Sequence, residues 1–252
     1  MTEPKNHHNA SELLTKVFIG LVVFALVGTA VSTWFKVDSR DIAPFVTVLL
    51  IICGSAVAAI AIGDLVAVIL LLVVCGGSEI IGVFTGLPFG HYEYTDRWWP
   101  TVWLAESHRF PLLIPFAWLL VVGGAYRLFR AKFSPWQAVP LSALLATLID
   151  IPMERAMTWL FVYWRWEPSG PLFGAPVMNS VGWLLVSLSA GSILALRDRA
   201  TDERNSSTVL GCFLLFVSLT GFIHRFEWAW VLLAILSVSV LAFSRNLSAQ
   251  KS

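Results

Sequence analysis

The sequence predicts an all-α integral membrane protein, a polytopic bundle of about eight transmembrane helices. Of its 252 residues, 57% are hydrophobic and only 13% are charged. Apolar runs of roughly 16 to 23 residues recur along the chain, and a helix needs about 20 such residues to cross a bilayer. No internal repeat or low-complexity linker divides the sequence, so we expect a single transmembrane domain over residues 1–252.

The apolar runs predict the helices in order. We expect membrane spans at residues 17–34, 44–62, 65–87, 110–129, 136–163, 179–196, 208–223 and 228–243. One helix from Pro44 to Leu87 would be about twice as long as a bilayer core of ~30 Å requires, so a tight turn at Gly63 and Asp64 is favoured. Seven spans would remain if these two merged or if the first were cleaved. The first run is long for a signal peptide, which favours a retained helix. The last two runs are short and suffice only with little tilt.

Lysine and arginine favour one orientation of the bundle. Ten lie on the side of the two chain ends, and six lie on the opposite side. The ten are Lys5, Lys16, Arg127, Arg130, Lys132, Arg197, Arg199, Arg204, Arg245 and Lys251, and the six are Lys36, Arg40, Arg97, Arg109, Arg165 and Arg225. By the positive-inside rule, we expect a multi-pass protein of a bacterial-type cell membrane with both termini in the cytoplasm.

Charge and cysteine content exclude other classes of protein. The net charge of +1 gives no long-range field that would recruit nucleic acid, so we expect no nucleic-acid partner. The expected surrounding partner is the lipid bilayer. Cys53, Cys75 and Cys212 lie inside apolar runs without the paired spacing of a zinc knuckle or a disulfide framework. We therefore expect small buried side chains and assign them no function.

Ionisable residues converge at one level of the predicted bundle, whichever way it is inserted. Glu79 lies about two turns before the end of the third span. Asp150 and Glu154 lie one turn apart on one face of the fifth, and Asn179 begins the sixth. The neighbouring loop and helix end add His91, Glu93, Asp96, His108, Arg109 and Arg155. Carboxyl groups inside a bilayer are costly and are either paired or kept neutral by burial, so each is a functional candidate.

Structural roles compete with these functional ones. Glu154 and Arg155 could neutralise each other, and Glu79 could be a hydrogen-bond partner between packed helices. Asp64 follows Gly63 at the expected hairpin and is more readily explained as a turn residue. The remaining loop residues could form an ordinary solvated loop; they are His91, Glu93 and Asp96.

Backbone and aromatic patterns mark the same level. Gly82 and Gly86 are four residues apart, which would let a neighbouring helix approach the third span closely. Pro152 would kink the fifth helix between Asp150 and Glu154 and leave room for a cavity. Aromatic residues gather there as an interfacial belt or as a lining that stabilises positive charge; they are Tyr92, Tyr94, Trp98, Trp99, Trp103, Trp159, Tyr163, Trp164 and Trp166.

Four motifs together resemble a known family. Residues 79–95 read E-x-x-G-x-x-T-G-x-P-F-G-x-Y-x-Y-T, and residues 110–118 read FPLLIPFAW. Residues 150–154 read D-x-P-M-E, and residues 174–183 read G-x-P-x-x-N-x-x-G-W. This combination, within a core of about residues 75–190, resembles the CruF-like carotenoid hydratase family of membrane proteins.

The resemblance implies an enzyme of carotenoid biosynthesis. Such proteins add water to the terminal (1′,2′) double bond of an acyclic carotenoid end group and leave a tertiary alcohol. Protonation of the alkene creates a tertiary carbocation that water captures, so the site needs a positioned acid, a cation-tolerant lining and a directed water, but no cofactor or metal. A downstream carotenoid desaturase or glycosyltransferase would act on the alcohol.

The residues can be given roles in this reaction. We expect Asp150 or Glu79 to protonate the alkene, and Glu154 with Asn179 to position water or accept its proton. A proton relay from the aqueous phase would use His91, Tyr92, Glu93, Tyr94 and Asp96, with Arg155 as the counter-ion of a deprotonated neighbour. The expected substrate lining is Phe89, Trp118, Met153, Trp159 and Trp183.

Three other functions remain as alternatives. Acid-catalysed cyclisation of the same end group differs only in that no water is admitted. A proton-coupled transporter would use the carboxyl groups as a relay, although the inner halves of these helices are nearly free of ionisable groups. A metal-dependent membrane oxidase would use His91, Glu93, Asp96 and His108, but five histidines are few for such an enzyme.

Overall fold

The fold is an all-α polytopic membrane bundle, as the sequence predicts. The computed structural model describes residues 3–37, 42–199 and 203–249. Seven helices in these ranges are long and apolar enough to cross a membrane. They are α1 (Glu3–Phe35), α2 (Ala43–Ile62), α3 (Leu65–Thr85), α6 (Pro135–Arg155) with its π-helical extension η2 (Ala156–Leu160), α7 (Val177–Leu196), α8 (Glu203–His224) and α9 (Trp228–Ala249).

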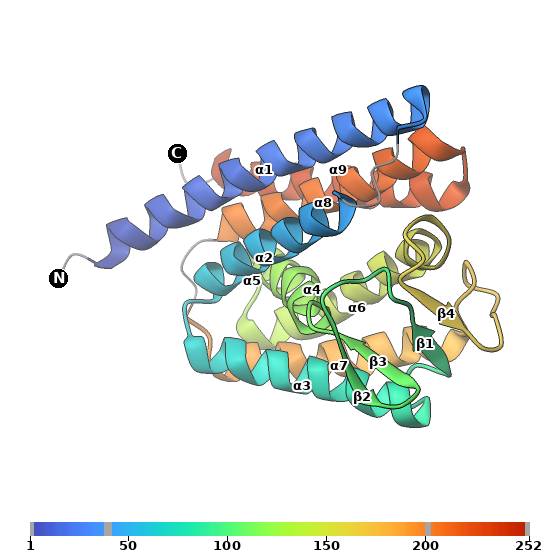
Figure 1. Cartoon of the computed structure of the whole chain (residues 1–252). Coiled ribbons are helices and arrows are strands. Elements are labelled where there is room, and N and C mark those ends of the chain that lie inside the picture. Colours follow the sequence, from blue (N-terminus) through green and yellow to red (C-terminus); the bar gives the residue numbers. More distant parts are fainter. Residues whose placement is uncertain (1–2, 38–41, 200–202, 250–252) are drawn as a thin grey trace.

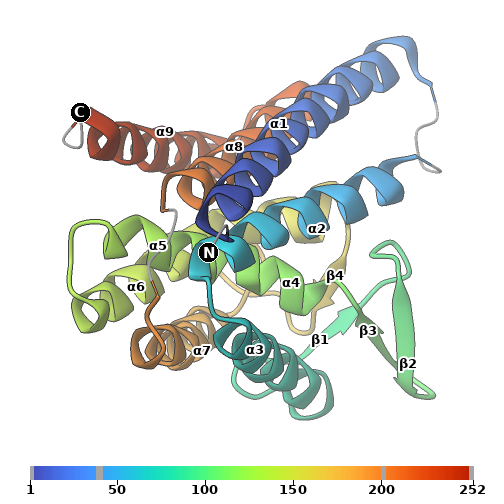
Figure 2. The same cartoon turned by 90° about the vertical axis from the view of Figure 1, so that its left-hand side faces the viewer.

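The helices form three layers, seen from two directions in Figures 1 and 2. α1, α8 and α9 make one outer layer, and α3 and α7 make the other. The middle layer contains α2, α6 and a central helical segment made of α4 (Ile114–Trp118), the π-helix η1 (Leu119–Gly123) and α5 (Gly124–Arg130). The central segment contacts α2, α3, α6 and α8, so the core of the bundle surrounds it.

Four short strands lie together at one end of the bundle, which we call the strand end (Figure 1). β1 (Tyr92–Tyr94) pairs antiparallel with β4 (Trp164–Trp166), with Tyr92 opposite Trp166. β2 (Thr101–Ala105) pairs antiparallel with β3 (His108–Pro111). The first turns of α1 and the last turns of α9 lie at the opposite end (Figure 1). The strands therefore cap the level at which the sequence gathers its ionisable residues.

The turn between α2 and α3 is as tight as expected. Gly63 adopts a left-handed conformation with φ of 68°, and the Asp64 side chain caps α3 by accepting the Ala67 N–H at 2.9 Å. Two separate helices, not one long one, therefore occupy residues 43–85. Asp64 is a turn residue and in addition pairs with Arg197 and Arg199.

The fourth expected span, residues 110–129, is wrong at its start. Phe110 and Pro111 belong to β3, and the helix begins at Ile114 with Pro115 in its first turn, where proline is tolerated. The segment is interrupted by η1 and is not among the seven spanning helices. Between Trp118 and Ala125 the segment is apolar and buried on all sides, because other helices surround it.

Several helix ends also differ from the expectation. The fifth span ends at Leu160, because the chain turns into β4 instead of continuing to residue 163. α1, α8 and α9 are longer than their apolar runs, since polar residues extend each of them at the end opposite the strands. Of the charges used for orientation, Arg40 and Lys251 lie outside the described residues, as do the side chains of Lys5 and Arg204. The orientation remains a prediction.

Gly82 and Gly86 do not serve a helix pair, contrary to the prediction. A Cβ on Gly82 would lie 2.8 Å from the Tyr92 hydroxyl and 2.9 Å from the Phe89 ring. Gly86 has φ of 76° and ends α3 in a left-handed conformation. Both glycines therefore let the loop after α3 fold back over the helix, which brings β1 against it.

Candidate active site

The first polar cluster centres on Glu79 of α3. Its Oε2 atom accepts hydrogen bonds from the hydroxyls of Tyr92 and Tyr94, both at 2.6 Å. Its Oε1 atom accepts the indole N–H of Trp118 at 2.8 Å. β1 alternates buried and exposed residues, so Tyr92 and Tyr94 both point inward while Glu93 points out. Loop, strand and central helix thus converge on one buried carboxyl group.

The second cluster joins α6 and α7. The side-chain nitrogen of Asn179 donates to Asp150 Oδ2 at 2.7 Å and to Glu154 Oε1 at 2.9 Å. The other oxygen of Glu154, Oε2, accepts the indole N–H groups of Trp164 at 3.0 Å and Trp166 at 2.7 Å. All three polar residues of the cluster are at most 2% exposed. One amide therefore links two buried carboxyl groups that lie one helical turn apart.

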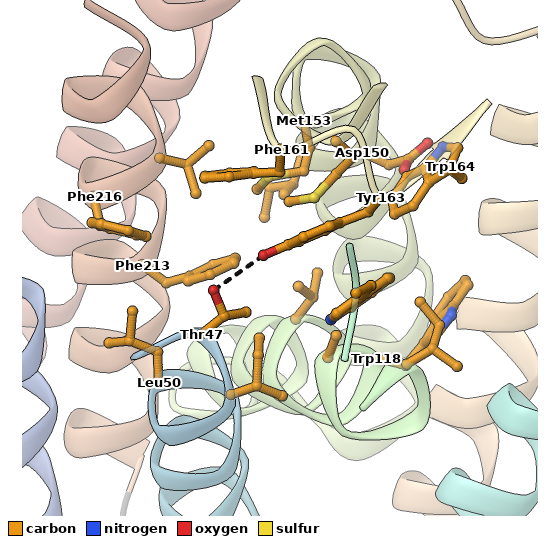
Figure 3. A pocket seen from close by; sticks show the side chains of 18 of the residues that line it. Thr47, Leu50, Trp118, Asp150, Met153, Phe161, Tyr163, Trp164, Phe213 and Phe216 are labelled. Carbon is orange, nitrogen blue, oxygen red and sulfur yellow. Dashed lines mark hydrogen bonds between the residues drawn. The ribbon is translucent and has the colours of Figure 1, made fainter. Parts of the chain in front are cut away.

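A narrow, mostly apolar cavity lies beside the two clusters (Figure 3). Its wall is built from α2, the central segment, α6, α7, α8 and the chain after η2. Asp150 is the carboxyl group that lines it, together with Met153, Trp118 and Trp183. The Oδ1 atom of Asp150 has no hydrogen-bond partner among the described residues. Asp150 is therefore the predicted carboxyl group that borders the cavity.

Glu79 and Glu154 lie behind the cavity wall. Glu79 holds Trp118 and Glu154 holds Trp164, and both indoles line the cavity. On another side of the cavity, Figure 3 shows Tyr163 reaching the Thr47 hydroxyl, at 3.0 Å. Because Thr47 donates to the Ala43 carbonyl, Tyr163 is the donor in this pair. The three predicted carboxyl groups thus share one region, but only Asp150 touches the hollow itself.

Aromatic rings make up much of the cavity wall. Trp118 stacks on Trp183 with ring centroids 3.8 Å apart. Tyr163 stacks between Phe161 at 5.3 Å and Trp98 at 4.9 Å. The negative faces of aromatic rings attract a positive charge, more strongly where water is excluded. A cation formed in this cavity would be stabilised by its walls.

The loop residues divide between inside and outside. Tyr92 and Tyr94 are buried, and their burial together with the neighbouring Glu79 raises the pKa of both hydroxyls well above its ordinary value. The two tyrosines are therefore hydrogen-bond donors at neutral pH. The predicted relay residues on the opposite face of the loop are exposed: His91, Glu93 and Asp96, the last 3.9 Å from Arg109.

Arg155 does not serve the role that the sequence suggested. It pairs with Glu227, with Nε to Oε2 at 2.5 Å and a second bond at 2.8 Å, and it does not neutralise Glu154. Successive residues of a helix point about 100° apart, so Glu154 faces the bundle while Arg155 faces its rim. The Arg155 guanidinium lowers the pKa of Glu227 below its ordinary value. Arg155 therefore pairs with Glu227 and not with Glu154.

Two expected lining residues lie away from the cavity. Phe89 is buried behind it, 6.1 Å from the Trp118 ring and packed on Gly182. Trp159 is partly exposed under Arg155, with the guanidinium 4.8 Å above the ring. The sequence also missed Thr47, Phe213 and Phe216 as lining residues, because helix residues on apolar runs carry no motif. The W-x-W pattern of residues 164–166 was the available signal for two indoles on one strand face.

Metal-binding clusters were expected only under the alternative of a metal-dependent oxidase. Within residues 3–37, 42–199 and 203–249, no three or more His, Cys, Asp or Glu side chains are arranged to hold one. His91 and Glu93 share a surface pocket with His108, but these groups do not form such a cluster.

Comparison with known proteins gives one match. A family model described as "Carotenoid biosynthesis protein" matches residues 42–243. The match includes both carboxyl clusters and helices α2 to α8, and most of α9. No curated protein and no solved structure matches the chain.

Proposed function

Because the chain belongs to the carotenoid biosynthesis protein family, we propose that it adds water to the terminal (1′,2′) double bond of an acyclic carotenoid. The family gives the chain a role in carotenoid biosynthesis, and its apolar spanning helices fit a substrate dissolved in the bilayer. The product would be a tertiary alcohol. An enzyme of a later step, such as a carotenoid desaturase or glycosyltransferase, would then use it.

The observation that carries this proposal is that Asp150 lines an apolar cavity and keeps one oxygen, Oδ1, without a hydrogen-bond partner among the described residues. Burial disfavours the charged form of a carboxyl group, so Asp150 is the acid that protonates the alkene. Asn179 donates to Oδ2, which fixes the carboxyl plane and leaves Oδ1 available to a substrate. Glu79, the other candidate for the proton donor, has both oxygens occupied by three donors and does not line the cavity.

The reaction balances within this site. The Asp150 proton moves to the less substituted carbon, C2, and the π electrons leave a tertiary cation at C1. The aromatic walls stabilise that cation until a water oxygen bonds to C1. The oxonium ion then returns a proton to the pair Asp150 and Glu154, which restores the acid. Water is consumed, and no electrons enter or leave.

Glu79 supports the site from behind. Its hydrogen bonds to Tyr92 and Tyr94 connect it to a surface pocket lined also by His91 and Glu93. Hydroxyl groups both donate and accept, so this path can pass protons between the aqueous phase and the buried carboxyl region. Trp118, held by Glu79, forms part of the cavity wall.

The size of the substrate agrees with the placement of the site. A carotenoid is a rigid rod of roughly bilayer length, so its end group reaches one interface when its body lies along the membrane normal. Asp150 lies in the half of α6 nearest the strand end, where such an end group would arrive. The largely apolar lining of the cavity also favours one alternative, cyclisation, in which a neighbouring alkene of the substrate captures the cation.

Expression in a host that accumulates an acyclic carotenoid tests the proposal. A pigment heavier by one water supports hydration, whereas an isomer of unchanged mass supports cyclisation. We expect Asp150→Asn to abolish the gain of water and Glu79→Gln to reduce it. Glu106→Gln serves as the control, because that carboxylate is exposed in the turn between β2 and β3. Wild-type turnover in both the Asp150 and the Glu79 variant would remove the proposed mechanism.

A further inference from the structure

Two pockets open at the strand end, and in each of them aromatic side chains separate the pocket from a buried carboxyl group. The tyrosine-walled pocket includes Tyr92 and Tyr94, which hold Glu79. The tryptophan-walled pocket includes Trp164 and Trp166, which hold Glu154. The tryptophan-walled pocket is also lined by the ion pair Arg155–Glu227, by Thr158, Arg165 and Ser169, and by the apolar side chains of Trp159 and Phe173.

The tyrosine wall and the tryptophan wall differ in whether a proton can move through them. A tyrosine hydroxyl donates and accepts, so a proton can move through it, whereas an indole N–H only donates. Trp164 and Trp166 therefore hold Glu154 without giving it a proton path to their pocket. The tryptophan-walled pocket needs a different explanation from the tyrosine-walled one.

Trp164 has a second contact that Trp166 lacks. Its side chain lines the tryptophan-walled pocket and also the apolar cavity, beside Asp150 and Tyr163. Trp166 donates to the same oxygen of Glu154 but does not line the cavity. The half-buried indole of Trp164 thus lies between an open pocket that contains an ion pair and hydroxyl groups and the cavity where a carbocation would form.

We propose that the tryptophan-walled pocket supplies the water that is consumed, and that this water enters the cavity past Trp164. The inference rests on the proposed hydration. Apolar cavities do not hold water, whereas a pocket with an ion pair and hydroxyl groups does. Water must therefore reach the cation from a neighbouring polar space. Its admission past one indole determines whether the cation becomes an alcohol or loses a proton and returns to an alkene.

A block of the pocket tests the route. Ser169 is exposed in the tryptophan-walled pocket, so a bulky thiol reagent on Ser169→Cys would fill it. Membranes that contain the full chain and an acyclic carotenoid are placed in D₂O. If water captures the cation, the product is the alcohol. If the cation loses a proton instead, it returns to the carotenoid, which then carries deuterium. We expect the label to lower alcohol formation by about tenfold or more while deuterium incorporation continues.

Two results would overturn this route. One is a labelled protein that forms alcohol at the unlabelled rate, and the other is an equal fall of alcohol and deuterium incorporation. Ser107→Cys, exposed in the tyrosine-walled pocket, is the matched control, and its label should leave the ratio of the two products unchanged. Reagent-treated wild type controls for Cys53, Cys75 and Cys212. If unlabelled protein gives neither product, the proposed function itself fails.

A pair of substitutions tests the role of Trp164 separately. Trp164→Phe and Trp166→Phe each remove one N–H from the same oxygen of Glu154, but only the first changes the cavity wall. We expect the ratio of alcohol to deuterated carotenoid to rise several-fold in Trp164→Phe and to stay at the wild-type value in Trp166→Phe. Equal ratios in the two variants would show that Trp164 acts through Glu154 alone, and would overturn its assignment.

Discussion

At the scale of single residues, Asn179 connects the two carboxyl groups of α6 through one nitrogen atom. Without it, Asp150 would lose its hydrogen-bond donor, and no donor would join the two buried carboxyl groups. Two neighbouring carboxylates repel each other, and a carboxyl group without a hydrogen-bond partner can rotate about its last side-chain torsion. Asn179 therefore positions the acid, although it need not contact the substrate.

We expect Asn179→Leu, which keeps the side-chain size but removes the amide, to slow hydration by about 10²-fold, as the loss of one preorganised donor does in other enzymes. The measurement is the rate at which an acyclic carotenoid gains water in membranes. Asn205→Leu is the control, because Asn205 binds Ser11 near the opposite end of the bundle. A wild-type rate in Asn179→Leu would show that Asp150 needs no positioning by α7.

Neighbouring residues in the sequence can have unrelated roles. Glu154 and Arg155 are adjacent and oppositely charged, which suggested a pair, but helical geometry directs them to different partners. The carboxyl cluster itself could be predicted, because Asp150, Glu154 and Asn179 stand out from apolar runs. The partner of each could not, since Glu227 is 72 residues from Arg155 and no spacing rule joins them.

At the scale of elements, two glycines of α3 differ in what they face. Gly82 leaves room for Phe89 and the Tyr92 hydroxyl, whereas a Cβ on Gly77 would meet nothing within 4 Å. We expect Gly82→Ala to destabilise the protein by about 1–3 kcal/mol through overpacking, and to slow hydration because Tyr92 moves off Glu79.

Gly77→Ala is the matched control on the same helix, and its better helix propensity should stabilise α3 by up to about 1 kcal/mol. Thermal unfolding in detergent and the hydration rate would be measured for both variants. Equal effects of the two substitutions would contradict the view that the loop after α3 is packed through Gly82.

The long apolar runs predicted the positions of the helices well, but they did not predict where the helices are interrupted. The boundaries of α2 and α3 follow from a tight glycine turn and an N-cap, which are local signals. The π-helices η1 and η2 have no such signal, yet one follows Trp118 and the other follows Arg155. π-helical segments are frequent at functional sites, because the extra residue reorients the side chains beside it. Tertiary packing decides where they form.

At the scale of the whole molecule, the two ends of the bundle have different tasks. The strand end carries the buried carboxyl clusters, the cavity and the pair Arg155–Glu227, whereas the ion pairs of Asp64 and Asp198 lie at the opposite end. Asp198 binds Arg127 and Arg130 of the central segment, and Asp64 binds Arg197 at the end of α7. These pairs hold the layers together at the end away from the cavity.

Asp64 gives this architecture a testable dependence on pH. Arg197 donates to both of its oxygens, at 2.9 and 3.1 Å, and lowers the pKa of Asp64 from 3.8 to about 2. A carboxyl group whose pKa is lowered by folding stabilises the folded state above its unfolded pKa, and this contribution is lost as the pH falls through the folded pKa. The stabilisation is therefore complete above about pH 5 and disappears between about pH 4 and pH 2.

We expect Asp64→Asn to lower the unfolding temperature of the detergent-solubilised protein at pH 6, because Arg197 loses its charged partner while the cap on α3 can be kept by the amide oxygen. The difference from wild type should shrink as the pH is lowered toward 2. Asp96→Asn, in an exposed pair at 3.9 Å, should give little difference at any pH, since screened surface pairs contribute little. A difference for Asp64→Asn that stays constant from pH 6 to pH 2 would mean that its effect comes from the helix cap, and that the pair with Arg197 does not stabilise the bundle.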